Sequence, residues 1–159
     1  MHESVRTPAR LAVETRLLLG ALALLGLLSW SVARAAPPQV SIGDARIRLL
    51  PGDLPLAGYF TLTNTGDAPV TLTGADSPAF AGVHLHRSVQ ANGVQSMTMV
   101  PGLTVAPHQS LRFEPGGYHL MLMGRRQTLT VGDRVPVALR FETGDALEVE
   151  FSVGAADSQ

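Results

Sequence analysis

The feature that most constrains this chain is a succession of short alternating segments separated by turn residues. From Pro37 onward, β-branched and aromatic residues alternate with polar ones in runs such as "AGYFTLTN" and "RVPVALRF". Clusters such as "NTGD" and "PGG" divide these runs, and no stretch has a sustained helical period. A period of two is typical of half-buried strands. About eight or nine short strands therefore predict an all-β chain, a single antiparallel Greek-key β-sandwich.

The N-terminal segment has a composition different from the rest. Three arginines precede the apolar run "LLLGALALLGLL", and small residues follow it up to Ala35. This order predicts a secretory signal peptide over residues 1–35, cleaved after Ala35. The alternative is an uncleaved anchor, which the short apolar run disfavours. We expect residues 36–153 to form one domain, residues 154–159 to be a frayed tail, and the mature form to have no membrane span.

Composition excludes several classes of function. Removing residues 1–35 takes away four of the 12 basic and two of the 13 acidic residues, which leaves 8 and 11 and a formal charge of −3. A nucleic-acid partner is therefore not expected. Cysteine is absent from the sequence. Thiol–disulfide exchange, blue-copper ligation and iron–sulfur clusters all need cysteine and are excluded.

Histidine and methionine are concentrated in one part of the expected mature chain. Between positions 84 and 123 the sequence contains four of each, namely His84, His86, His108, His119, Met97, Met99, Met121 and Met123. In "GYHLMLMG", a histidine and two methionines occupy alternate positions, so in a strand they share one face.

The Asn92-Gly93 pair predicts a two-residue hairpin turn. That turn would place His86 directly opposite Met99 and diagonal to Met97, on one face together with His84. Opposed Cβ atoms lie about 5 Å apart and diagonal ones about 7–8 Å, within reach of a shared ion. A second strand that brings His119 and Met121 alongside would complete a site of two imidazoles and two thioethers.

Thioether sulfur is a soft neutral donor, and soft ligands select Cu(I) over zinc, magnesium or calcium. Four neutral ligands also suit a monovalent ion, because they leave no excess negative charge. Only the imidazoles compete with protons near neutral pH. The cluster therefore predicts a soft-metal site that could load and release Cu(I) without a thiol.

The spacing of these residues resembles a known family. His86, ten residues, Met97, twenty-one residues and then His119-Leu120-Met121 reproduce the H-x10-M-x21-H-x-M signature of the periplasmic copper chaperones called PCuAC. The segments "AGYFTLTNTGD", "LHRSVQANGVQSM" and "PGGYHLMLMG" are also similar to that family, over about residues 40–152. The sequence departs from the family after Ala45, where relatives usually carry tryptophan, and at Met99, where a second methionine is unusual.

The resemblance implies a cupredoxin-like β-sandwich that binds one Cu(I) through His86, Met97, His119 and Met121. It further implies an exported periplasmic protein that delivers copper to cytochrome c oxidase assembly. The acceptor would be the subunit with the copper A site or a Sco-type protein. A closed monomer is expected, and the protein is expected not to be an enzyme.

Plainer interpretations remain open for the other residues. Met123 is expected to pack in the core, while Met99 is either core packing or an auxiliary ligand. His84 is a solvent-facing residue at a strand end or a neighbour of the ligands, and His108 is a solvated turn residue. His84, Met99 and Met123 are the candidate auxiliary metal residues.

Three other functions remain as alternatives to a copper carrier. One is a copper-buffering or resistance protein without a specific client, which transfer kinetics would separate from a chaperone. Another is a copper redox enzyme, although an enzymatic copper normally keeps an open coordination position. The last is a structural or adhesive domain in which the histidine–methionine pattern is coincidence.

Overall fold

A computed structural model of the chain describes residues 38–91 and 93–156, in which the regular elements are all β-strands. Ten strands follow one another in this part of the chain: β1 (Val40–Arg48), β2 (Leu56–Asn64), β3 (Val70–Asp76), β4 (Phe80–Ala91), β5 (Val94–Met99), β6 (Leu103–Val105), β7 (Ser110–Phe113), β8 (Tyr118–Arg125), β9 (Arg134–Phe141) and β10 (Ala146–Gly154).

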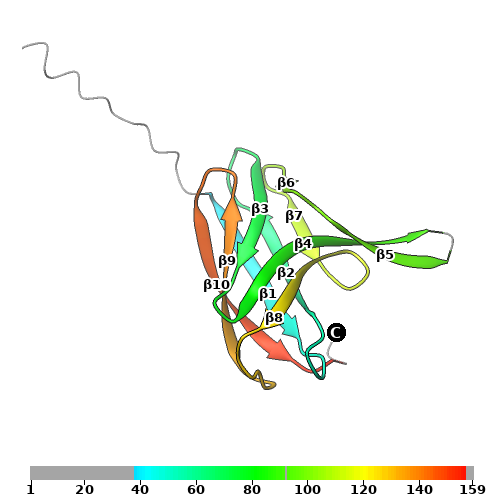
Figure 1. Cartoon of the computed structure of the whole chain (residues 1–159). Helices are drawn as coiled ribbons and strands as arrows, with labels where there is room; N and C mark the ends of the chain where they lie inside the picture. Colours follow the sequence, from blue (N-terminus) through cyan, green and yellow to red (C-terminus); the bar gives the residue numbers. More distant parts are fainter. Residues whose placement is uncertain (1–37, 92, 157–159) are drawn as a thin grey trace, which may run out of the picture. The chain divides into compact units, whose positions relative to one another are not determined.

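The strands close into a barrel, so the predicted sandwich is wrong although the all-β class is confirmed. The hydrogen-bonded order is β5-β4-β8-β7-β2-β1-β10-β9-β3-β6, and β3 also pairs with β4 through Ala75 and Val83. This pairing closes a ring of eight strands, with β5 and β6 attached outside it (Figure 1). Closure gives each of the eight ring strands a neighbour on both sides, and β5 and β6 remain as edge strands.

The barrel is not purely antiparallel, which is a second departure from the prediction. β1 runs parallel to β10, with Arg46 paired to Ser152, and β7 runs parallel to β8, with Phe113 paired to Tyr118. Strands that are parallel neighbours cannot be joined by a tight hairpin. The β1–β10 contact therefore depends on the packing of segments distant in the chain, whereas β7–β8 is one paired position between consecutive strands.

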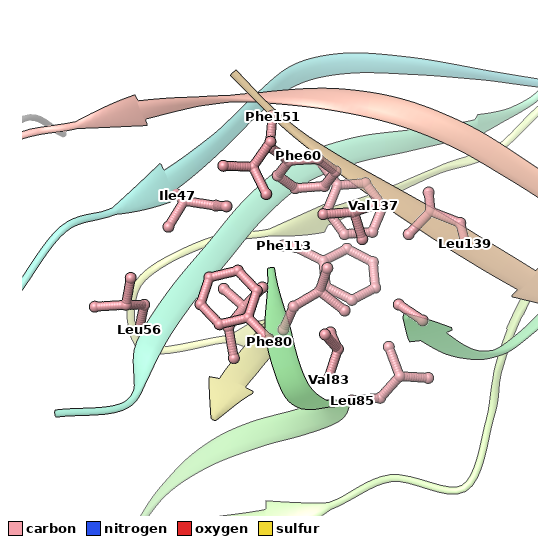
Figure 2. Packing of buried hydrophobic residues seen from close by; sticks show 14 of the residues in the cluster. Ile47, Leu56, Phe60, Phe80, Val83, Leu85, Phe113, Val137, Leu139 and Phe151 are labelled. Carbon is pink, nitrogen blue, oxygen red and sulfur yellow. The ribbon is translucent and has the colours of Figure 1, made fainter. Parts of the chain in front are cut away.

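The inside of the barrel holds the hydrophobic core, shown in Figure 2. Phe60 stacks on Phe113 with ring centroids 4.1 Å apart, and Phe151 meets Phe60 edge-on at 5.7 Å. From β8, Leu120 and Leu122 enter the same core and are fully buried. Each such side chain stabilises the fold by about 1.5–3 kcal/mol relative to exposure.

The β4–β5 hairpin has the predicted register. Ala91 pairs with Val94 across the two-residue turn, and His86 pairs with Met99. Gly93 has a φ of 77°, which turns of this type need and glycine adopts without a Cβ clash. Figure 1 shows β4 and β5 running side by side away from the other strands.

The predicted leader, with its cleavage point after Ala35, lies outside the described residues. In the described part of the chain, no helix has the length and apolarity that crossing a bilayer requires. Gly154, the first residue of the expected tail, belongs to β10, and its carbonyl accepts a hydrogen bond from the N–H of Leu49 at 2.9 Å.

Candidate metal centre

Three neighbouring strands, β5, β4 and β8, bring the histidines and methionines onto one outer face of the barrel. His86 on β4 pairs with Met99 on one side and with His119 on the other. Directly paired residues point to the same face of a sheet. Met99, His86 and His119 therefore form a row across the three strands.

The adjoining rows add the remaining donors. Met97 pairs with Ser88, two residues along β4 from His86, and Met121 pairs with His84, two residues the other way. Met97 and Met121 are thus diagonal neighbours of His86, at Cα separations of about 7–8 Å. The predicted gathering of two imidazoles and two thioethers on one face is present.

The inward face of the same strands explains how the row of candidate ligands is positioned. Val83 and Leu85 on β4 alternate with the histidines, and Leu120 and Leu122 do so on β8. All four are buried in the core. Since side chains of a strand alternate between faces, burying the leucines directs His119 and Met121 outward.

His119 is held by its surroundings, with only 5% of its surface exposed. Its Nδ1 lies 3.2 Å from the carbonyl oxygen of Gly117. A carbonyl only accepts, so Nδ1 carries the proton and Nε2 of the neutral ring keeps a lone pair. The same carbonyl accepts a hydrogen bond from the N–H of Ser88 at 3.0 Å, so the group that orients His119 is itself bonded to β4. A ligand histidine oriented through its other nitrogen is a common feature of metal sites.

His86 carries an unsatisfied buried atom. Its Nδ1 is buried and has no hydrogen-bond partner among the described residues. Its ring lies 5.9 Å from that of His119, measured between centroids, and 6.5 Å from that of His84. Burial, followed by repulsion from His119 and then His84, lowers the pKa of His86 below 6.5. The neutral imidazole is the form that binds a metal.

A hollow of about 320 Å³ contains three of the four residues in the family pattern. Met97, His119 and Met121 line it, together with Arg48 and Tyr59 from β1 and β2. Met97 is 58% exposed, so its thioether is free to move toward an ion in this hollow. This placement favours Met97 over Met99 as the partner of His119 and Met121.

A separate hollow of about 370 Å³ contains His84 and Met99. It lies where the neighbour of β4 changes from β5 to β3, and the ion pair of Asp76 with Arg140 lines its rim. Met99 is 61% exposed, which excludes core packing. The structure thus separates Met99 from the hollow that holds Met97.

Two of the plainer interpretations are wrong. Met123 is 40% exposed and pairs with Gly82 on the outer face, so it does not pack in the core. His84 lies within β4 and is half-buried, not at a strand end. His108, as predicted, is exposed in its turn, where its Nε2 lies 3.0 Å from a carboxylate oxygen of Asp67.

Sequence reasoning missed the residues around the candidate ligands. One of them is Gly117, whose carbonyl lies beside Nδ1 of His119. The others line the hollow, namely Ser88, Arg48 and Tyr59. The one signal that the sequence offers for them is the glycine pair before Tyr118, which is typical of a tight turn. At the position where relatives carry tryptophan, the guanidinium of Arg46 lies 5.5 Å above the Tyr59 ring.

The donor set of this face is distinctive. Within residues 38–91 and 93–156, no group of three or more His, Cys, Asp or Glu side chains could hold a metal ion. The other donors on this face are the thioethers of Met97, Met99, Met121 and Met123. Two imidazoles combined with thioethers form a set that soft ions prefer.

Comparisons with known proteins agree with this geometry. The LpqE-like family model, described as "Putative lipoprotein LpqE-like", matches residues 40–153. The chain is 34% identical over 98 residues to "Putative lipoprotein Lxx21020" of Leifsonia xyli subsp. xyli, covering 61% of this chain and 59% of that protein. It is 29% identical over 87 residues to "Uncharacterized protein RP573" of Rickettsia prowazekii, covering 54% and 48%. The matches thus span only about half of these relatives.

Solved structures are similar over more of their length. The Cu(I) form of DR1885 from Deinococcus radiodurans, solved in solution, is 34% identical, with a TM-score of 0.60 and coverage of 78% of this chain and 83% of that one. The copper-bound PCuAC domain from PmoF2 is 23% identical, with a TM-score of 0.63 and coverage of 76% and 96%. The latter likeness concerns the fold alone.

Proposed function

The chain belongs to the LpqE-like family, a part of the PCuAC family, and from this premise we propose that it is an exported Cu(I)-binding metallochaperone. The ligands would be His86, Met97, His119 and Met121. The observation that carries the proposal is the arrangement of donors across β5, β4 and β8, which makes His119 the direct partner of His86 and Met97 and Met121 its diagonal neighbours.

The state of the two imidazoles supports this ligand set. His119 is oriented by the Gly117 carbonyl with Nε2 left as the donor, and His86 has a buried Nδ1 that lacks a partner. A buried polar atom without a partner costs free energy. Coordination of an ion by His86 would add a favourable interaction to the same ring and offset part of that cost. Both histidines are therefore suited to binding an ion reversibly.

Carrier function follows from the chemistry of the ligands. Thioethers are neutral ligands that stabilise Cu(I), whereas thiolates are anionic ligands whose binding is coupled to deprotonation. Release of Cu(I) from thioethers therefore does not require protonation of a sulfur. Met97 is largely exposed, which gives an acceptor protein access to the ion from that side. An enzyme would keep a coordination position open for substrate, whereas four mixed ligands close the site. Rapid Cu(II)/Cu(I) turnover with a substrate would contradict this view.

The acceptor is proposed as a component of cytochrome c oxidase assembly, either the copper A subunit or a Sco-type protein, in the periplasm. The support is the family and the signal-peptide pattern of residues 1–35. The competing function is a copper-buffering or resistance protein without a client. Transfer to a purified copper A domain should be faster than transfer to a small chelator of equal Cu(I) affinity. Equal rates would favour buffering.

The test of Cu(I) binding is an anaerobic competition titration of the purified protein against a chromophoric chelator. We expect one tightly bound equivalent that His119→Gln weakens strongly. The matched control is His108→Gln, the same change at an exposed histidine outside the hollow, and it should leave the affinity unchanged. Met121→Leu removes the sulfur while conserving volume, and it should act like His119→Gln. Unaltered binding in both site variants would overturn the proposal.

A further inference from the structure

Three donors on the outer face are left over once the four family positions are assigned. These are His84, Met99 and Met123, and each lies on the same face as the first set. Two of them have thioethers that are 61% and 40% exposed. Exposed methionine contributes little to packing, and its thioether is accessible to an ion.

His84 lies between the other two. It is two residues from His86, which pairs with Met99, and two residues from Gly82, which pairs with Met123. Both thioethers are therefore diagonal neighbours of His84, one on each side of β4, at about 7–8 Å between Cα atoms. His84 and Met99 also line the same hollow of about 370 Å³, which does not include the residues of the first hollow.

The glycine at position 82 makes room for the imidazole. A Cβ built on Gly82 would lie 3.0 Å from Nε2 of His84, closer than ordinary contact. The ring therefore leans along the strand, toward position 82. Position 82 pairs directly with Met123, so the ring leans toward the row on β4 whose partner on β8 is Met123.

The local charges favour a soft monovalent ion here. The nearby carboxylate, Asp76, is paired with Arg140 at the rim of the hollow. Its charge is thus balanced by the guanidinium, and the free donors are one imidazole and two thioethers. Such a set binds Cu(I) in preference to harder ions.

We propose that His84, Met99 and Met123 form a second, more exposed Cu(I) site beside the first. Met99 pairs directly with His86 of the first set, so the two sites are one cross-strand step apart. The proposal rests on the proposed copper-binding function. The second ion is held by three donors, two of them largely exposed, and it binds more weakly than the first.

The test is the Cu(I) stoichiometry of the purified protein under anaerobic conditions. We expect two equivalents, the second weaker, and loss of only the second in the triple variant His84→Gln/Met99→Leu/Met123→Leu. Leucine conserves the methionine volume, and all three sites lie outside the core, so the variant is expected to fold. His108→Gln is the matched histidine control and should still bind two.

Methionine methyl NMR on the unaltered protein provides a second measurement that needs no variant. The first equivalent should shift the methyl signals of Met97 and Met121, and the second those of Met99 and Met123. A single equivalent in the wild-type chain, or a second equivalent that survives in the triple variant, would overturn the second site. Absence of any Cu(I) binding would instead overturn the proposed function, and His119→Gln should weaken only the first equivalent.

Discussion

The two faces of β8 differ in burial, because one packs in the core and the other carries the methionines. Leu120 and Leu122 point into the barrel and are 0% and 1% exposed, whereas Met121 and Met123 point outward into hollows or solvent. His119 differs from both groups, since it points outward yet is buried beneath the turn at Gly117. The inner face determines stability, and the outer face can carry donors at little cost to folding. At His119, a single residue is both buried and positioned as a metal donor on the outer face.

The largest expected effect is on the inner face. Leu122→Ala should lower the free energy of unfolding by about 2–5 kcal/mol, because it removes buried methyl groups and leaves a cavity. The matched change Met123→Ala, one position along but on the outer face, should cost no more than about 0.5 kcal/mol, as exposed substitutions do. Urea denaturation of the metal-free protein measures both. Similar losses in the two variants would contradict the assignment of the faces.

A smaller but more specific effect should separate the two methionines of β5. Met97→Leu should weaken the first Cu(I) equivalent by about 10- to 100-fold, since changes to residues that merely orient ligands already cost that much. Met99→Leu should leave this equivalent nearly unchanged, because Met99 lies in the other hollow.

Anaerobic competition with a chelator measures both affinities. The opposite result, with Met97→Leu normal and Met99→Leu defective, would mean that the ligand assignment is wrong by one hairpin pair. Circular dichroism of the metal-free variants would check that neither change has altered the fold.

The smallest effect concerns pH. The pKa of His86 is lowered in the folded protein by burial and by His119 and His84, so the unfolded state takes up its proton more readily. The stability of the metal-free protein should therefore rise as the pH increases toward 6.5, the ordinary value for the ring, and level off above it. Urea midpoints on either side of that pH, compared with His86→Gln, measure this contribution. A midpoint that falls with rising pH only in the wild type would contradict it.

Local features could be predicted from the sequence because they depend on neighbouring residues. The register of the β4–β5 hairpin follows from the Asn92-Gly93 turn, since turn type and loop length determine which residues pair. The alternation in "YHLMLMG" likewise placed His119 and Met121 on one face. Barrel closure could not be predicted, since it depends on pairings between strands distant in the chain, such as Ala75 of β3 with Leu139 of β9 and Arg46 of β1 with Ser152 of β10.

By itself, then, the sequence determined the all-β class, the hairpin register and the soft donor set. Only the tertiary structure decided that β8 lies beside β4, where His119 faces His86, and that Met97 and Met99 line different hollows. The physical reason is that a hairpin encodes its own pairing over a few residues, whereas neighbours distant in the chain are selected by the packing of the whole core. Burial of His119 and the change in the neighbour of β4 are consequences of that packing.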